Sequence, residues 1–330
     1  MRAIITGVGH YVPDRKLTNK DLEQMVDTSD EWITTRTGIK ERRILDDDDK
    51  GTSYMAAKAA KIVLEQRNIS ADELDLIIVA TITPDMPFPA TAALVQKELN
   101  TTKGWGFDLN GACTGFIYAL ATASQFIETG KYNKIMIIGA DKMSSIIDYE
   151  DRNTCPIFGD GAGAVLLESS NDKDLGIEDF ILHLDGSGFK YLCMPAGGSL
   201  LPASHETVKE KKHYLYQEGK TVFKYAVNGM SDVATKIMEK NGLTAKDIKL
   251  LIPHQANLRI IDAVANKMKL NKEQVIININ KYGNTTAGTI PIAMSEAYEK
   301  KMMSKGDWVI LSTFGAGFTW GSLLLKWAMD

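Results

Sequence analysis

Residues 106–120 read GFDLNGACTGFIYAL. An apolar run leads into the Asn110-Gly111 turn, and this order predicts a strand that ends in a tight turn. No charged residue occurs from Leu109 to Ile127, so we expect the following helix to be apolar on all sides and to lie in the interior. Cys113 would stand at its N-terminus, where free N–H groups and the helix dipole favour a thiolate. A nucleophile and a small buried hydrophobe are about equally supported by this segment alone.

The bulk composition limits the class of protein. A chain of 330 residues can bury a large core as one domain or two fused halves. The net charge of −4 favours neither disorder nor binding to nucleic acid, and no apolar stretch is long enough to span a bilayer. The cysteines Cys113, Cys155 and Cys193 are odd in number and widely spaced, so we expect a reducing, cytoplasmic location and no metal site.

The chain repeats its own order of elements. Helical patterns over residues 53–64 and 225–239 each precede an apolar strand pattern. The expected strands fall into three pairs separated by 170 to 174 residues, namely 74–80 with 248–254, 107–109 with 277–279, and 134–138 with 307–311. Near-constant spacing over three elements indicates an internal duplication of α/β units.

The duplication predicts an α/β fold. Continuous apolar strands that alternate with helices are typical of sheets covered on both faces. Two such sheets with a shared helical layer form a five-layered α-β-α-β-α sandwich. We expect an N-terminal half over 1–170, which holds the cysteine, and a C-terminal half over 171–330. The polar segments 170–188 and 197–212 are interpreted as the connection between the halves and as a surface insertion.

Three polar side chains follow expected strands, where the carboxyl ends of parallel strands usually place the chemistry. Cys113 follows one strand, His254 follows another, and Asn284 follows the counterpart of the Cys113 strand. A histidine at a strand-to-helix junction is either a general base or donor, or a helix cap. Asn284 after a glycine is ordinarily a turn former or an N-cap, so its functional role depends on a position beside His254.

A glycine-rich turn over residues 312–321 lies between two apolar runs near the C-terminus. Small residues let backbone N–H groups approach a ligand oxygen, as an oxyanion hole requires, although a tight hairpin explains the pattern as well. Residues 158–163, FGDGAG, lack the Lys and Ser or Thr of a phosphate loop, so a turn is the better interpretation there.

Taken together, these motifs resemble the β-ketoacyl-acyl-carrier-protein synthase III family. The resemblance covers essentially the whole chain, and it is carried by five segments: DTSDEWITTRTGI at 27–39, NGACTGF at 110–116, HQAN at 254–257, GNT at 283–285, and FG at 314–315 with FTWG at 318–321. It implies the thiolase-like fold, a homodimer, a cytoplasmic location, and no metal or cofactor beyond a coenzyme A thioester substrate.

The resemblance also implies a two-step reaction that starts type II fatty-acid synthesis. Cys113 would accept an acyl group from acetyl-CoA or another short acyl-CoA. His254 and Asn284 would hydrogen-bond the thioester oxygen of malonyl-acyl carrier protein during its decarboxylation. The backbone N–H groups of Cys113 and Ala316 would form the oxyanion hole for the acyl transfers.

Further roles carry over by resemblance, and each has an ordinary surface or packing alternative. Coenzyme A binding is implied for Thr28, Trp32, Arg36, Arg152, Gly219 and Asn257. Binding of the acidic carrier protein is implied for Gln255, Arg259 and Lys224. The acyl pocket would involve Phe314 and also Phe88, which would reach into the partner subunit.

Two departures from the family pattern affect these expectations. The family often has three consecutive glycines where this chain has Gly315-Ala316-Gly317, so Ala316 would be strained if its φ had to be positive. The 194–212 segment is longer than expected and leaves the primer preference open.

The sequence offers three alternative functions, and the last of them is disfavoured. A related Cys-His-Asn condensing enzyme could use longer acyl-CoA in a specialised pathway. A cysteine hydrolase would use the same three residue types but needs water at the site. A non-catalytic partner subunit is disfavoured, because such subunits typically lose the nucleophile and Cys113 is present.

Overall fold

The computed structural model describes residues 1–330. Its first sheet is mixed and has the strand order β1-β7-β6-β4-β5. The strands are β1 (Arg2–Tyr11), β7 (Gly161–Ser170), β6 (Lys134–Asp141), β4 (Leu76–Ala80) and β5 (Trp105–Leu109). β4 is parallel to both β5 and β6, while β7 is antiparallel to β6 and β1. The carboxyl ends of β4, β5 and β6 therefore meet at one edge.

The second sheet repeats the first. Its order is β11-β12-β13-β8, from β11 (Ile248–Pro253), β12 (Trp308–Gly315), β13 (Thr319–Lys326) and β8 (Gly176–Leu184). β11 is parallel to β12, and β13 is antiparallel to β12 and β8, as their counterparts are in the first sheet. The duplication predicted from the sequence is present, and the expected strands around 248–254 and 307–311 are confirmed.

Two expectations about the second half were wrong. Residues 277–279 form no strand; instead a single bridge joins Val275 to Leu251, and the chain turns into α9 (Ile279–Tyr282). The 170–188 segment is not only a connection, because it contains the edge strand β8.

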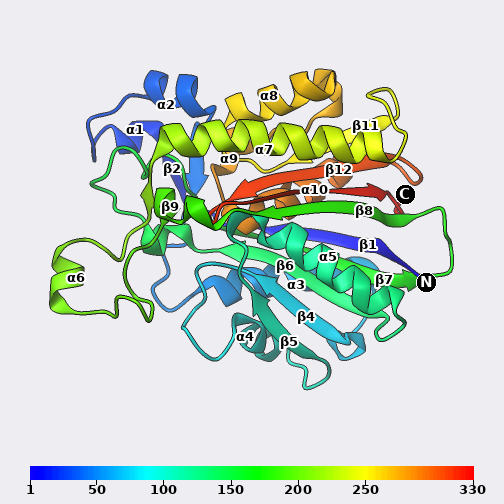
Figure 1. Cartoon of the computed structure of the whole chain (residues 1–330). Coiled ribbons are helices and arrows are strands. Elements are labelled where there is room, and N and C mark those ends of the chain that lie inside the picture. Colours follow the sequence, from blue (N-terminus) through cyan, green and yellow to red (C-terminus); the bar gives the residue numbers. More distant parts are fainter.

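Helices form three layers around the two sheets (Figure 1). One outer layer holds α3 (Thr52–Arg67) and α4 (Thr91–Glu98), and the other holds α7 (Gly219–Lys240) and α8 (Leu258–Met268). The shared central layer holds α5 (Gly115–Glu128) and α10 (Thr289–Glu299), which contact strands of both sheets. The arrangement is the predicted five-layered sandwich.

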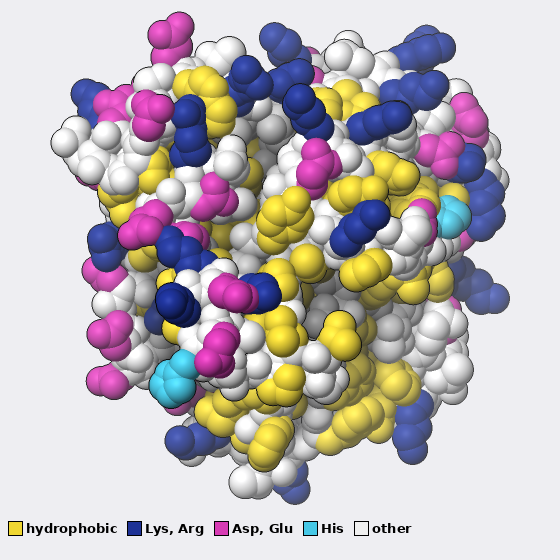
Figure 2. Space-filling model, turned by 60° about the vertical axis from the view of Figure 1, so that its left-hand side comes forward, with side chains coloured by type: hydrophobic (Ala, Val, Ile, Leu, Met, Phe, Trp, Pro, Cys, Tyr) yellow, Lys and Arg dark blue, Asp and Glu magenta, His cyan; other side chains and the backbone are white.

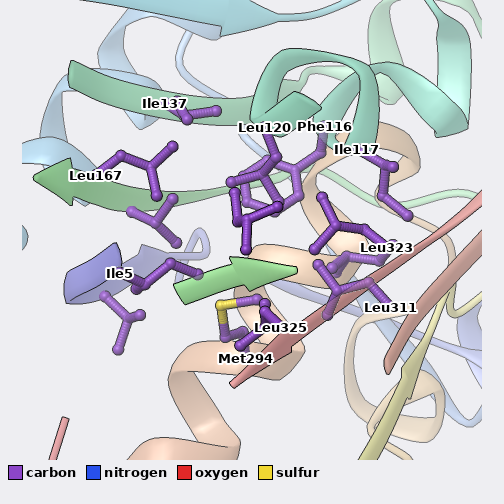
Figure 3. Close-up of a cluster of buried hydrophobic side chains, with 14 of the residues drawn as sticks. Ile5, Phe116, Ile117, Leu120, Ile137, Leu167, Met294, Leu311, Leu323 and Leu325 are labelled. Carbon is purple, nitrogen blue, oxygen red and sulfur yellow. The ribbon is translucent and has the colours of Figure 1, made fainter. Parts of the chain in front are cut away.

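The central layer is the largest buried hydrophobic cluster. Figure 3 shows Phe116 and Leu120 of α5 and Met294 of α10 directed at side chains from both sheets, and all three side chains are fully buried. This cluster contains side chains of both sheets, so the two sheets share a central core, and each buried large apolar side chain contributes about 1.5–3 kcal/mol to stability. The division into halves at residue 170 falls between β7 and β8 and stays a prediction.

The remaining short helices and strands lie around the side of the sandwich that holds the cavity described below. They are β2 (Lys16–Thr18), α1 (Asn19–Leu22), α2 (Asp30–Thr37), β3 (Glu41–Arg43), β9 (Leu192–Cys193), α6 (His205–Lys209) and β10 (Tyr216–Gln217). The predicted insertion carries α6 and projects from the body of the molecule (Figure 1). Lys211 fastens it by ion pairs to Asp148 and Glu150. None of the helices has the length and apolar character to cross a bilayer.

Candidate active site

One cavity of about 840 Å³ brings together the three side chains predicted from the sequence. Cys113, His254 and Asn284 all line it, together with Phe314. The exposed fractions of the three polar residues are 7%, 2% and 5%, in that order, so the reacting groups lie at the buried end. Figure 2 shows the side of the molecule that carries the insertion, where hydrophobic side chains gather around hollows near the centre.

The Cys113 turn has an unusual backbone. The 3₁₀ turn Ala112–Thr114 connects β5 to the buried helix α5, and Ala112 has a φ of 48°. A left-handed conformation at a residue with a Cβ costs of order 1 kcal/mol or more and persists only where its surroundings enforce it. The turn thus presents Cys113 at the strand-to-helix junction, two residues before α5 begins at Gly115.

The thiol of Cys113 is neutral at rest. Burial raises its pKa to about 12, and the charge of Asp141 acts in the same direction. Burial therefore opposes the effect of the helix end, because removal from water disfavours the charged form. The thiol loses its proton when it reacts with substrate.

The β12–β13 connection encloses the Cys113 turn from the other sheet. Thr313 donates a hydrogen bond of 3.0 Å to the carbonyl of Cys113, and Thr319 contacts Thr114 at 3.0 Å. At Gly315 an added Cβ would come within 2.9 Å of the backbone nitrogen of Cys113, so only glycine permits this approach. Residues from both sheets therefore set the position of the nucleophile.

Ala316 is free of the strain considered from the sequence. Its φ is not positive, and the conformation that favours glycine falls on Gly317, with a φ of 139°. The Ala316 N–H donates to no group of the protein. An unengaged, partly exposed N–H beside the Cys113 turn is suited to bind an oxyanion.

His254 directly follows β11. Its backbone N–H donates to Ser312 at 2.8 Å, which extends the pairing of β11 with β12 by one residue. Its ring Nδ1 lies 2.7 Å from the hydroxyl of Thr289 in α10, which leaves Nε2 as the ring nitrogen available to a ligand. Burial lowers the pKa of His254 to about 3, so the ring is neutral at rest.

Asn284 is fixed by its backbone and by its amide oxygen. Its N–H donates to Ile157 at 2.9 Å, and its carbonyl accepts from Gly159 at 3.1 Å. The amide oxygen accepts the N–H of Thr286 at 2.8 Å. The Nδ2 group makes no hydrogen bond within the protein, so it is the donor that this side chain offers to the cavity.

A buried carboxylate, Asp141 at the end of β6, was missed by the sequence analysis. Four groups of residues 81–83 donate to Oδ1: the hydroxyls of Thr81 and Thr83 and the N–H groups of Ile82 and Thr83. The hydroxyl of Thr286 and the N–H of Ala287 donate to Oδ2. Burial raises the pKa of Asp141, but six donors and no acceptor require the ionised form.

An arginine-flanked tryptophan lies at the outer part of the cavity. The guanidinium carbons of Arg36 and Arg152 lie 5.7 and 5.4 Å from the centre of the Trp32 ring. Trp32 and Arg36 line the cavity, and Arg152 is paired with Asp27 at 3.1 Å. Thr28, in the same segment, has a buried hydroxyl without a partner.

The residues of α7 and α8 that were predicted to bind coenzyme A or the carrier protein lie around the mouth and the wall of the cavity or on the exposed face. Arg259 is exposed, lines the cavity mouth and lies 5.0 Å from the ring of Phe223. Asn257 and Gly219 also line the cavity, and Asn257 caps α8 and donates to the carbonyl of Arg36 at 3.0 Å. Lys224 is exposed on α7.

Gln255 does not suit the predicted contact with a carrier protein. Its exposed fraction is 1%, and its amide makes four hydrogen bonds inside the fold, to Pro253, Ile276, Asn278 and Ile279. We correct its assignment to a structural one. It fastens the 276–279 segment, which replaces the expected strand, to the end of β11.

The two phenylalanines assigned to an acyl pocket lie apart. Phe314 is buried in the cavity wall. Phe88 does not line this cavity, and its exposed fraction of 84% is the largest of any aromatic side chain. It is available to another molecule rather than to its own site.

Comparison with known proteins decides the family. The family model for 3-oxoacyl-[acyl-carrier-protein] synthase III matches residues 107–186, and the model for its C-terminal part matches residues 238–327. A β-ketoacyl-[acyl-carrier-protein] synthase III of Chlorobaculum tepidum is 56% identical over 328 residues, 99% of this chain and 100% of the relative. The chain belongs to the β-ketoacyl-acyl-carrier-protein synthase III family. It is a condensing acyltransferase with the thiolase-like fold.

Other synthase III relatives agree with this assignment. The β-ketoacyl-[acyl-carrier-protein] synthase III 2 of Bacteroides thetaiotaomicron is 53% identical over 330 residues, which is all of this chain and 98% of the relative. The solved synthase III of Aquifex aeolicus has a TM-score of 0.90 and 46% identity, and it covers 98% of this chain and 100% of its own. A priming ketosynthase of the R1128 polyketide pathway is less similar, at 31% identity over 99% of this chain and 97% of its own, with a TM-score of 0.91. The specialised-pathway alternative is therefore not favoured.

Asp141→Asn should destabilise this synthase and slow its acylation. The substituted side chain has one acceptor oxygen, so donors that now meet the second oxygen would face an N–H₂ group. We expect the free energy of unfolding to fall by about 3 kcal/mol, measured by urea denaturation. The exposed Asp48→Asn is the matched control. Equal stability of both variants would contradict the role of Asp141.

Proposed function

We propose that this chain joins a short acyl group from acyl-CoA, with acetyl-CoA as the expected primer, to malonyl-acyl carrier protein and so starts fatty-acid synthesis. The observation that carries the proposal is the shared cavity of Cys113, His254 and Asn284. In that cavity Nε2 of His254 and Nδ2 of Asn284 have no partner within the protein, and the Ala316 N–H is also unengaged.

Acylation begins with the neutral thiol. The thiol gives up its proton to the solvent as Sγ of Cys113 attacks the thioester carbon of acyl-CoA. The N–H groups of Cys113 and Ala316 stabilise the negative charge that forms on the carbonyl oxygen. The carbon–sulfur bond to coenzyme A breaks, coenzyme A leaves as a thiolate, and the acyl group stays on Cys113.

Condensation uses the second substrate as its own source of a carbanion. The bond between the malonyl carboxylate and the methylene carbon breaks, CO₂ leaves, and the electron pair forms an enolate. Nε2–H of His254 and Nδ2 of Asn284 hydrogen-bond the enolate oxygen. The methylene carbon attacks the acyl thioester, the β-ketoacyl product forms on the carrier protein, and Cys113 is released as a thiolate that takes up a proton from the solvent.

The outer cavity suits coenzyme A. A ring flanked by two guanidinium groups offers a stacking surface for an adenine and positive charge for phosphates. Trp32, Arg36 and Arg152 are assigned to that end of the substrate. Gly219 and Asn257 line the same cavity as Cys113, and the unpartnered hydroxyl of Thr28 lies in the segment before Trp32.

Asn284→Ala should separate the two half-reactions. We expect acylation of Cys113 to stay within about threefold of the wild-type rate, and condensation to fall about 100-fold because one enolate donor is lost. Mass measurement of the acylated Cys113 peptide reports the first step, and β-ketoacyl product reports the second. Cys113→Ala should form no acyl-enzyme. Turnover by that variant would reject the proposed function.

The rim of the cavity carries positive charge toward a carrier protein. Arg259 lines the mouth, and Lys224 is exposed on the adjacent helix α7. An acidic protein that delivers a thioester to the cavity would meet both side chains, and such charges act mainly on the rate of association.

Arg259→Glu should weaken use of the carrier protein more than use of acyl-CoA. We expect kcat/KM for malonyl-carrier protein to fall about tenfold, with a smaller salt dependence, while the acylation rate stays within about twofold. The exposed Lys305→Glu, at the opposite end of β12, serves as the charge-matched control. An equal decrease in both variants would argue against a specific carrier surface.

We further propose a homodimer in the cytoplasm. The edge strand β5 has a half-exposed Trp105, and the adjoining groove is lined by Leu109, Tyr118, Phe180, Leu182 and Leu184. An unpaired strand edge beside an apolar groove is a ready surface for a second copy. The three free cysteines support a reducing compartment.

Phe88→Asp should also weaken the proposed dimer, because the family resemblance directs this exposed side chain into the acyl pocket of the partner subunit, where the change would bury a charge. Sedimentation velocity on the 36.4 kDa chain measures the result, and we expect a shift of at least tenfold in the dimer dissociation constant. Ile62→Asp, on the outer face of α3, is the control. A dimer unaffected by Phe88→Asp would place the interface elsewhere.

A further inference from the structure

The proposed oxyanion donor, the N–H of Ala316, stands in a loop whose own backbone does not fix it. Ala316 lies between two glycines, and Gly317 has a φ of 139°. Glycine leaves the backbone free to rotate, so the direction of an N–H between two glycines needs a constraint from outside the loop. The Ala316 N–H donates to no group of the protein, so it supplies no constraint of its own.

The hydroxyl of Thr319, the first residue of β13, supplies that constraint. Its Oγ1 lies 3.0 Å from the carbonyl oxygen of Ala316 and 3.0 Å from Oγ1 of Thr114, the residue after the nucleophile. The carbonyl oxygen of Gly111, which precedes the Cys113 turn, lies 3.3 Å away. A hydroxyl has one proton, and these three oxygens share it. The same side chain thus joins the loop of the oxyanion donor to the turn of the nucleophile.

The Thr319 hydroxyl lies out of reach of the substrate. Thr319 and Thr114 are both buried, and neither lines the cavity. The two segments meet closely at this point, because a Cβ added at Gly315 would lie 3.2 Å from Oγ1 of Thr319 and 2.9 Å from the Cys113 nitrogen. A hydrogen bond removed from water is electrostatically stronger than one in solvent, so the buried hydroxyl can hold the two segments together.

We propose that Thr319 is a positioning residue that fixes the Ala316 N–H relative to the Cys113 N–H in the oxyanion hole, an assignment that rests on the proposed function. When Sγ attacks the acyl thioester, the carbonyl carbon becomes tetrahedral and its oxygen takes the negative charge. Both N–H groups must then point at that one oxygen. Without the Thr319 hydroxyl the Ala316 N–H can turn away. Cys113 keeps its place, because the Thr313 hydroxyl still donates to its carbonyl.

Thr319→Val tests this assignment through two reactions of Cys113, because valine keeps the shape of threonine and loses the hydroxyl. Acylation by acetyl-CoA forms a bond from Sγ to a carbonyl carbon and places charge on the carbonyl oxygen. Alkylation by iodoacetamide forms a bond from Sγ to a saturated carbon, iodide leaves, and no charge develops on an oxygen. Both rates depend on the ionisation of the thiol, so their ratio reports the oxyanion hole alone.

We expect acylation of Thr319→Val at saturating acetyl-CoA to fall about tenfold while alkylation stays within about twofold, both followed by mass measurement of the Cys113 peptide. Complete loss of an oxyanion donor costs about 100- to 1,000-fold, and a donor that is present but loose should cost less. Thr319→Ser keeps the hydroxyl and should acylate within about threefold of the wild-type rate. Thr235→Val is the matched control, because the buried hydroxyl of Thr235 has no partner and the residue does not line the cavity.

Three results would overturn this assignment: wild-type acylation by Thr319→Val, an equal fall in acylation and alkylation, or a loss that Thr319→Ser does not restore. Thr319→Ala removes the hydroxyl without placing a methyl group there, and it should show the same fall in the ratio even where valine does not fit. Failure of the proposed function would look different. The wild-type enzyme would then form no acyl-Cys113 from acetyl-CoA, although iodoacetamide would still alkylate Cys113.

Discussion

The geometry of the site depends on a carboxylate that never meets the substrate. Asp141 ends a strand of the first sheet, yet two of its six hydrogen bonds come from the turn before α10, in the second half of the chain. The Asp141 carboxylate fixes the left-handed Thr286 through the Thr286 hydroxyl, and the N–H of Thr286 in turn fixes the amide of Asn284. Because the carboxylate is buried and fully hydrogen-bonded, it can hold both segments rigidly.

The internal duplication of α/β units explains why the three reacting groups come from distant parts of the chain. The carboxyl ends of equivalent strands, β4 to β6 in one sheet and β11 to β12 in the other, face a common junction across the central helices. At that junction Gly315 comes against the backbone of Cys113. A site built from two fixed sheets resists the loss of orientation that a site on mobile loops would suffer.

The sequence predicted the elements that are buried on both faces and missed those defined by an edge or by a single contact. Strands such as β4 and β11 are continuous apolar runs and were found. The edge strand β8 is half-exposed and carries charged residues, so it resembled a loop. The 277–279 segment has strand-like residues, but the amide of Gln255 takes hydrogen-bond donors that a neighbouring strand would use. Asp141 left one signal, an acidic residue at the end of an apolar strand.

Burial decides an electrostatic question that the sequence left even. A helix end favours a thiolate and an apolar interior favours a neutral thiol; the loss of water moves the pKa of Cys113 to about 12 and the pKa of His254 to about 3, which favours the neutral form of both groups. Such a site favours a reaction that moves charge to a place where donors are already fixed. In decarboxylation the malonyl carboxylate leaves as neutral CO₂, and its negative charge moves to an enolate oxygen for which two donors are already placed. Reacting groups that are almost fully buried, with donors already fixed, therefore suit condensation better than hydrolysis, which would need water beside Cys113.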